Sequence, residues 1–233
     1  MKKKIAIVTY SHGREGTSAL MGILRCFGYN VPNKTVISSM NPKGFFEDPE
    51  FDQKIFEFYN RNNGDLSLPP TQEELLEIFN QNKTSDFKKL FADLIKGESK
   101  YALKAPRYLL LPLLEEVIDD YQFKIIHITR NEKDHIKSVY RVWQNIKGIE
   151  LEKKRMKKNE IRKWIKKWKG FGKHQLAKNS LPVIEISFED IIKNKEKSIL
   201  QIAEFLEEEQ ISVDIFNWIE PKLVNRKKLS LKW

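Results

Sequence analysis

The chain has 233 residues, of which 40% are hydrophobic and 32% charged, with a net charge of +10, a composition typical of one soluble globular domain over residues 1–233. No stretch reaches the ~18 apolar residues of a membrane-spanning helix, and the apolar run at 5–9 is too short for a secretory signal. We therefore expect a cytoplasmic protein without a transmembrane segment. The single cysteine, Cys26, excludes an intrachain disulfide and a cysteine-built metal site, and the four histidines lack metal-ligand spacing.

The pattern of apolar residues predicts alternating strands and helices along the chain. Short β-branched and apolar runs predict strands at 5–9, 101–103, 123–129 and 183–187. Amphipathic patterns predict helices at 17–27, 50–60, 71–95 (as two helices), 108–118, 133–144, 160–177 and 196–207. Buried strands that alternate with helices of this length predict an α/β fold of three layers, a mostly parallel sheet flanked by helices.

The loop after the first predicted strand has the features of an anion site. It contains Gly13 and Gly16, and the helix that follows begins near Thr17 and Ser18. A glycine-bearing turn at a helix N-terminus points backbone N–H groups and the helix dipole at a negative ligand. The alternative is an ordinary strand-to-helix turn in which Thr17 caps the helix. A Walker A loop is excluded, because Thr17 stands where that motif has its lysine.

Most of the positive charge lies in one segment. Residues 147–178 hold 13 Lys or Arg against three Glu, which equals the whole net charge of +10. A nucleic-acid-binding surface would spread its charge over several elements, so no nucleic-acid partner is expected. The i, i+3, i+4, i+7 spacing of Ile161, Trp164, Ile165 and Trp168 predicts a buried helix face with solvated lysines opposite. An electropositive lid over a ligand is the functional alternative.

Five segments, in order along the chain, resemble motifs of bacterial sulfotransferases. They are Arg-Glu-Gly-Thr-Ser at 14–18, Asn-Pro-Lys-Gly-Phe-Phe-Glu at 41–47, Lys-Ala-Pro-Arg at 104–107, an Arg130 followed eight residues later by Ser138, and a final strand and helix at 183–206. The resemblance implies a P-loop-like sulfotransferase fold. It also implies transfer of a sulfuryl group from 3′-phosphoadenosine 5′-phosphosulfate (PAPS) to a hydroxyl or amine of a small-molecule or glycan acceptor.

The resemblance assigns two anion sites to PAPS. The phosphosulfate would be bound by Gly13, Arg14, Glu15, Gly16, Thr17 and Ser18. The 3′-phosphate would be bound by Arg130 and Ser138, since a guanidinium and a hydroxyl suit a terminal phosphate. A surface ion pair of Arg130 with Glu132 or Asp134 is the alternative. Glu15 replaces the family's usual serine, so it either points away from the phosphosulfate or pairs with Arg14.

The transfer itself needs a base and a positive charge at the leaving oxygen. We predict Glu47 as the general base, with His12 as second candidate. The alternative is that Glu47 and Asp48 only cap the helix near Glu50. Lys104 and Arg107 are predicted to bind the acceptor or the transferred group, unless they are solvated charges. No metal is needed.

Two other functions are alternatives to the sulfotransferase interpretation. The first is a nucleotide or small-molecule kinase with a degenerate P-loop. The second is a non-enzymatic binder of nucleic acid or membrane surfaces through residues 147–178. The sequence specifies neither the acceptor nor the oligomeric state.

Overall fold

The sheet of the protein is parallel throughout. The computed structural model describes residues 4–32, 46–57, 68–80, 83–95, 97–104, 109–111, 114, 121–145 and 155–219. In this part of the chain, four strands pair in the order β2-β1-β3-β4. They are β1 (Lys4–Tyr10), β2 (Lys100–Lys104), β3 (Tyr121–Thr129) and β4 (Val183–Ser187). The four predicted strands and the three-layer α/β class are confirmed.

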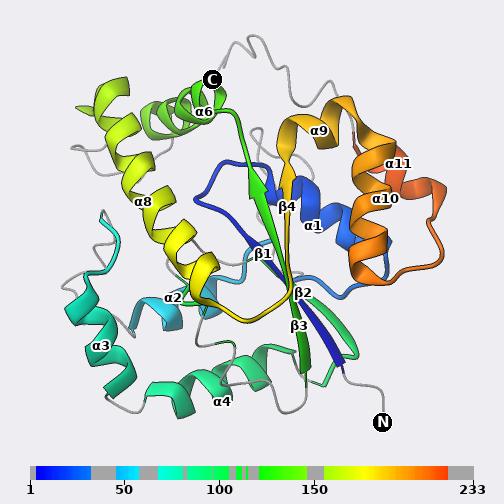
Figure 1. Cartoon of the computed structure of the whole chain (residues 1–233), viewed down its shortest axis with the longest axis horizontal. Coiled ribbons are helices and arrows are strands. Elements are labelled where there is room, and N and C mark those ends of the chain that lie inside the picture. Colours follow the sequence, from blue (N-terminus) through cyan, green and yellow to red (C-terminus); the bar gives the residue numbers. More distant parts are fainter. Residues whose placement is uncertain are drawn as a thin grey trace.

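Helices cover both faces of this sheet (Figure 1). One face carries α2 (Pro49–Glu57), α3 (Gln72–Asn80), α4 (Lys83–Ile95), α6 (Glu132–Asn145) and α8 (Lys158–Lys178). The other carries α1 (Thr17–Cys26), α9 (Phe188–Lys193), α10 (Lys195–Leu206) and α11 (Val213–Trp218). The central strand β3 shows why two layers are needed, because its neighbours Ile125 and Ile126 are fully buried in opposite cores.

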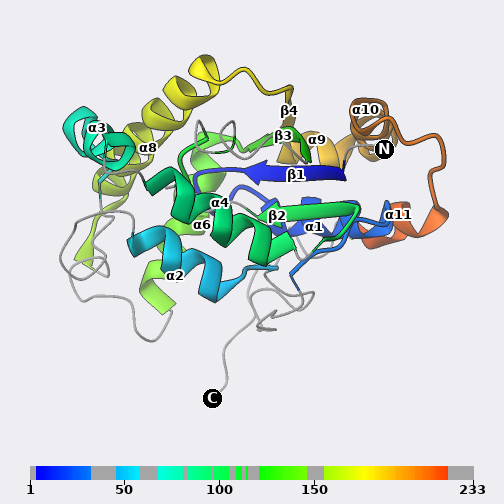
Figure 2. The same ribbon diagram turned by 90° about the horizontal axis from the view of Figure 1, so that it is seen from below.

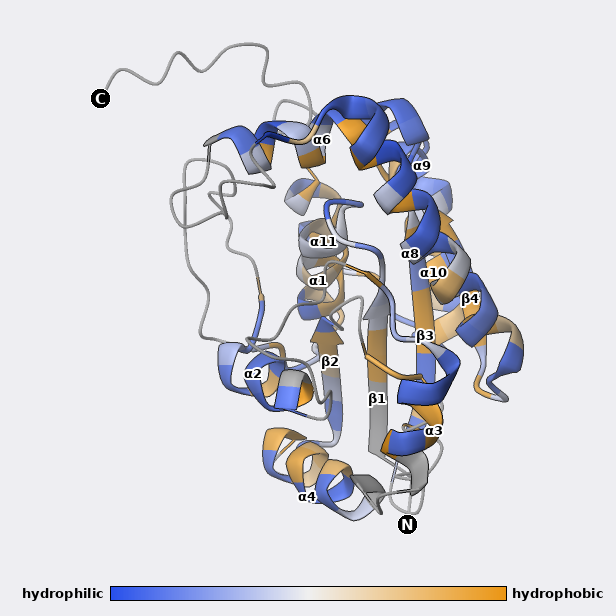
Figure 3. Ribbon diagram, turned by 90° about the vertical axis from the view of Figure 1, so that its left-hand side faces the viewer, coloured by the Kyte–Doolittle hydropathy of each residue, from blue (hydrophilic) through white to orange (hydrophobic). Residues whose placement is uncertain are grey.

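The basic helix α8 packs as its spacing predicts. Ile161, Trp164, Ile165 and Trp168 are all buried in one core, where the ring centre of Trp164 lies 5.0 Å from that of Trp143 in α6. Figure 3 shows hydrophobic colouring on the strands and mostly hydrophilic colouring on the outer side of α8. Apolar burial therefore fixes this helix, and most of its lysines remain in solvent.

Two short helices were not predicted, α9 and α11. Each has six residues, fewer than two turns, so neither shows a readable helical period. Ser187 and Ser212 cap them by accepting backbone N–H groups. Figure 2 shows α11 beside α1, and a Cβ on Gly22 of α1 would lie 1.8 Å from the ring of Trp218. The predicted helix at 108–118 lies largely outside the described residues.

Candidate active site

The candidate site lies where the parallel strands end. The carboxyl ends of parallel strands share one edge of a sheet, and ligands of such sheets collect there. At this edge β1 leads into the loop 11–16, β2 ends at Lys104, and β3 ends just before Arg130. The fold thus brings three predicted site segments to one edge.

The loop has the backbone shape of an anion cradle. Gly13, Arg14 and Gly16 all have positive φ, at 84°, 61° and 105°. Gly16 is also sterically required, since a Cβ there would lie 2.2 Å from the ring of Phe188. Within the described part of the chain, no hydrogen bond takes the backbone N–H groups of residues 14–17. These groups are available to a negatively charged ligand.

The capping alternative for this loop is wrong. Gly16, and not Thr17, is the N-cap of α1, and it offers no side-chain cap. Thr17 is the first helical residue and is buried. The start of α1 is therefore made by glycine geometry, which leaves its first N–H groups open.

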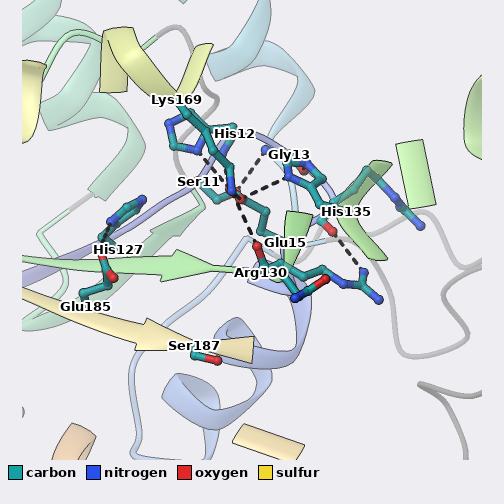
Figure 4. Close-up of polar contacts among 12 residues, drawn as sticks. Ser11, His12, Gly13, Glu15, His127, Arg130, His135, Lys169, Glu185 and Ser187 are labelled. Carbon is teal, nitrogen blue, oxygen red and sulfur yellow. Dashed lines mark hydrogen bonds and ion pairs between the residues drawn. The ribbon is translucent and has the colours of Figure 1, made fainter. Parts of the chain in front are cut away.

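Glu15 turns into the protein and does not pair with Arg14. Its side chain is fully buried and accepts two hydrogen bonds from His12, from the backbone N–H at 2.8 Å and from Nδ1 at 3.0 Å. Its other oxygen lies 3.3 Å from Nδ1 of His135 and 3.1 Å from Nζ of Lys169 (Figure 4). Burial would raise the pKa of Glu15, but the contacts with His12 and the charge of His135 lower it to about 2.

His12 is enclosed beneath α8. With Nδ1 donating to Glu15, its other ring nitrogen, Nε2, has no hydrogen-bond partner among the described residues. That nitrogen faces Gly172, where a Cβ would lie 2.3 Å away, and the residue is only 2% exposed. His127 is buried in β3 and contacts Glu185 at 3.0 Å.

Arg130 contacts the loop formed by residues 11–16 (the anion loop). Its Nη1 donates to the carbonyl oxygen of Arg14 at 3.1 Å, and its guanidinium lies 4.9 Å from the centre of the Phe188 ring. The expected alternative partners are engaged elsewhere, because Glu132 pairs with Arg162 and Asp134 with Lys137.

The two site arginines lie close enough to repel each other. Burial, followed by the charge of Arg130, lowers the pKa of Arg14. The Nε groups of Arg14 and Arg130 are buried, and neither has a hydrogen-bond partner within the described ranges. Two neighbouring guanidinium groups in this state can bind an anion between them.

Ser138 lies on the helix face that looks toward the loop. His135, one turn earlier on α6, contacts the carbonyl oxygen of Gly13 through Nε2 at 2.8 Å. Residues three apart share a helix face, so Ser138 follows His135 on the side of the anion loop. Ser138 is half-buried.

Glu47, Lys104 and Ser18 come together from three separate segments. The ammonium group of Lys104 lies 2.6 Å from Oε1 of Glu47 and 3.4 Å from the hydroxyl of Ser18. Lys104 is 12% exposed, so it is not a solvated charge, whereas Glu47 is 48% exposed. Burial lowers the pKa of Lys104, and Glu47 opposes this shift.

Of the two acids considered as caps of α2, Asp48 has that role. Its Oδ1 accepts the backbone N–H groups of Glu50 and Phe51 at 3.0 and 3.1 Å. Phe46, buried and 6.1 Å from the Trp218 ring, holds the segment from the other side. Glu47 is left to face Lys104.

Some of the predicted site lies outside the described residues, namely 41–45 of the Asn-Pro-Lys-Gly segment and Arg107. The sequence interpretation missed His135, Lys169 and Phe188 as partners of the site residues. The sequence carried a signal for His135 alone, because it lies three residues before Ser138 on the same helix face.

Among the described residues, no three His, Cys, Asp or Glu side chains are grouped to hold a metal ion. None of the described helices is long and apolar enough to cross a membrane.

Solved structures share this three-layer fold. A sulfotransferase from Alicyclobacillus acidocaldarius is 17% identical with a TM-score of 0.51, and the match covers 96% of this chain and 89% of that one. The sulfotransferase STF9 from Mycobacterium avium is 11% identical with a TM-score of 0.53, covering 98% and 70%. Mouse sulfotransferase SULT7A1, complexed with PAP, is 16% identical with a TM-score of 0.51, and this chain spans 65% of its length.

A comparison of the sequence with family models shows the family. The model of the sulfotransferase domain matches residues 2–219, nearly the whole chain. The chain therefore belongs to the sulfotransferase domain family, as the ordered motifs indicated. A search of curated proteins found no match.

Proposed function

We propose that this chain transfers the sulfuryl group of PAPS to a hydroxyl or amine of a small-molecule or glycan acceptor. The contact of Glu47 with Lys104, beside Ser18 of the anion loop, carries the proposal. In it, a carboxylate and a cation lie next to the first residues of α1, at the edge where ligands of parallel sheets collect. We propose the cytoplasm as the compartment, in keeping with the single cysteine.

Two clusters of the chain suit the two charged ends of PAPS. For the phosphosulfate, we propose the open N–H groups of residues 14–17 with Arg14 and the hydroxyl of Ser18. For the 3′-phosphate, we propose Arg130 and Ser138. The buried Nε of Arg130, which has no hydrogen-bond partner among the described residues, supports this assignment. So does the similar fold of mouse sulfotransferase SULT7A1, whose structure is a complex with PAP.

The proposed chemistry uses two side chains in turn. Glu47 accepts the proton of the acceptor O–H or N–H group as its oxygen or nitrogen bonds to sulfur. Lys104 stabilises the negative charge on the phosphate oxygen as the bond between sulfur and that oxygen breaks. The products are the sulfated acceptor, adenosine 3′,5′-bisphosphate (PAP) and a protonated Glu47. His12 is the weaker candidate for base, because α8 encloses its Nε2 atom.

The activity is tested with PAPS labelled in its sulfuryl group. The protein is incubated with a panel of hydroxyl and amine acceptors, without metal ions and with a chelator. Transfer of label to at least one acceptor, reduced by Glu47→Gln, supports the proposal. Magnesium-dependent transfer from ATP, or salt-sensitive binding of RNA or anionic vesicles without any affinity for PAP, would establish one of the alternatives instead.

A further inference from the structure

A fully buried carboxylate directly beneath a proposed anion site requires an explanation. Glu15 stands in the loop between Arg14 and Gly16, where a negative charge would repel the phosphosulfate. The side chain nevertheless has zero exposure and points away from Arg14 into the protein. A residue that only filled space would not need a charge there, since burying an unpaired carboxylate is costly.

The partners of Glu15 come from three elements of the fold. His12 belongs to the loop itself, His135 to α6 and Lys169 to α8. Figure 4 shows these side chains gathered around the Glu15 carboxylate. The carboxylate is therefore a junction between the loop and the two helices that flank it.

Two of these partners also hold backbone at the proposed anion sites. His135 contacts the carbonyl oxygen of Gly13 at 2.8 Å. Lys169 donates to the carbonyl oxygen of Arg130 at 3.5 Å while it contacts Glu15 at 3.1 Å. Through them, one carboxylate connects the loop backbone with the end of β3.

We propose that Glu15 is a positioning residue for the cofactor-binding loop. Its carboxylate, held by His12, His135 and Lys169, fixes the loop 11–16 against the end of β3 in the shape that receives the phosphosulfate. The positive charge of Lys169 offsets the repulsion between the Glu15 carboxylate and the ligand. This inference rests on the proposed function, because it assumes that the loop binds PAPS.

The protonation of His135 gives this role a distinctive signature. The Nε2–H group of His135 can donate to Gly13, and Nδ1 then faces Glu15 at 3.3 Å, a contact that is satisfied only when the ring is doubly protonated. Burial lowers the pKa of His135 to about 4, with Lys169 and His12 acting in the same direction and Glu15 opposing them. A bound anion would favour the protonated ring. Near pH 5, just above that pKa, ligand binding should therefore take up a proton at His135, and removal of the Glu15 charge should reduce this uptake.

The experiment measures PAP binding by titration calorimetry, with a chelator, in two buffers of different ionisation enthalpy. Glu15→Gln keeps an acceptor for His12 but removes the charge. Glu185→Gln is the matched control, because Glu185 makes the same 3.0 Å contact with the Nδ1 of a histidine, His127, while its own carboxylate is 66% exposed. We expect Glu15→Gln to bind PAP at least tenfold more weakly with reduced proton uptake, and Glu185→Gln to stay within twofold of the wild type.

Three results would overturn the inference. Equal or tighter PAP binding by Glu15→Gln, with wild-type proton uptake, would mean that the carboxylate only repels ligand, while the proposed function stands. An equal loss in Glu185→Gln would indicate general destabilisation. Failure of the wild type to bind PAP would overturn the proposed function as well. If Glu15→Gln does not fold, Lys169→Met carries the same test, because Lys169 is 33% exposed and reaches the carboxylate from outside.

Discussion

The ammonium group of Lys104 lies 2.6 Å from the carboxylate of Glu47, although 57 residues separate them in the chain. Lys104 is the last residue of β2, and Glu47 precedes α2. The pair exists only because the parallel sheet places the end of β2 beside the start of α1 and the segment before α2. Its cation also reaches Ser18, so the proposed base and the anion loop share one charged partner.

The first prediction concerns Glu47 as the base. Glu47→Gln keeps the size of the side chain and removes its basicity, so turnover should fall by ~10²–10⁴ with a hydroxyl acceptor. PAP affinity should change little. Asp48→Ala is the control, since Asp48 caps α2: it should lower the free energy of unfolding by about 1 kcal/mol and leave turnover nearly intact. Near-normal turnover in Glu47→Gln would move the search to His12.

The second prediction concerns Arg130 and the 3′-phosphate. Arg130→Ala should weaken PAP binding by roughly 1.5–3 kcal/mol, tenfold or more, and should weaken AMP binding much less. Arg162→Ala removes the same charge from a surface pair with Glu132, both about half exposed, and should change neither affinity. An equal loss for PAP and AMP in Arg130→Ala would make Arg130 a structural residue.

The third prediction concerns the shape of the anion loop. Gly16→Ala combines a positive φ with a contact of 2.2 Å to Phe188, so it should cost about 2–4 kcal/mol of stability and disrupt PAP binding. Gly28→Ala has a comparable φ of 82° with open space around it, so it should cost only about 1–2 kcal/mol. Thermal unfolding of both variants, with and without PAP, compares them. Equal behaviour of the two would contradict the tight packing of Phe188 on the loop.

The fourth prediction concerns pH and Asp52 of α2. Burial, with the charge of Glu47, raises the pKa of Asp52 to about 7, although Lys104 opposes the shift. The unfolded chain loses this proton near pH 4, so the folded state loses relative stability as pH rises from about 4 to about 7. Asp52→Asn should therefore be more stable than the wild type by about 2–4 kcal/mol at pH 8 and equally stable at pH 4.

Chemical denaturation at several pH values measures this difference. Asp93→Asn, on the exposed side of α4, is the control and should give a curve parallel to that of the wild type. A constant difference between Asp52→Asn and the wild type at all pH values would show that the Asp52 carboxyl is not shifted.

The sequence predicted the elements that have a long or strongly alternating apolar pattern. All four strands and the helices α1, α6, α8 and α10 were located within a few residues. The buried stripe of α8 was also predicted, because Ile161, Trp164, Ile165 and Trp168 show the i, i+3, i+4, i+7 spacing of one helix face. The helices α9 and α11 were missed because six residues are too few to show a period.

The candidate site was predictable only where its residues adjoin strand ends or helix starts. Lys104 and Arg130 follow apolar runs directly, so their place at the sheet edge could be inferred. The environment of Glu15 could not, because His135 and Lys169 lie on helices more than a hundred residues away along the chain. The ion pair of Glu15 with its neighbour Arg14, one of the two alternatives from the sequence, was wrong for this reason.

The proposed function requires that the chain recognises the 3′-phosphate of a PAPS-like nucleotide without a metal ion. Thermal unfolding with PAP or AMP, each in a chelator, tests it most directly. If PAP is present at 100 times its Kd, it should add about 2.7 kcal/mol to the free energy of unfolding, and AMP at the same concentration should add far less. Equal stabilisation by the two nucleotides, or none by either, would contradict the claim.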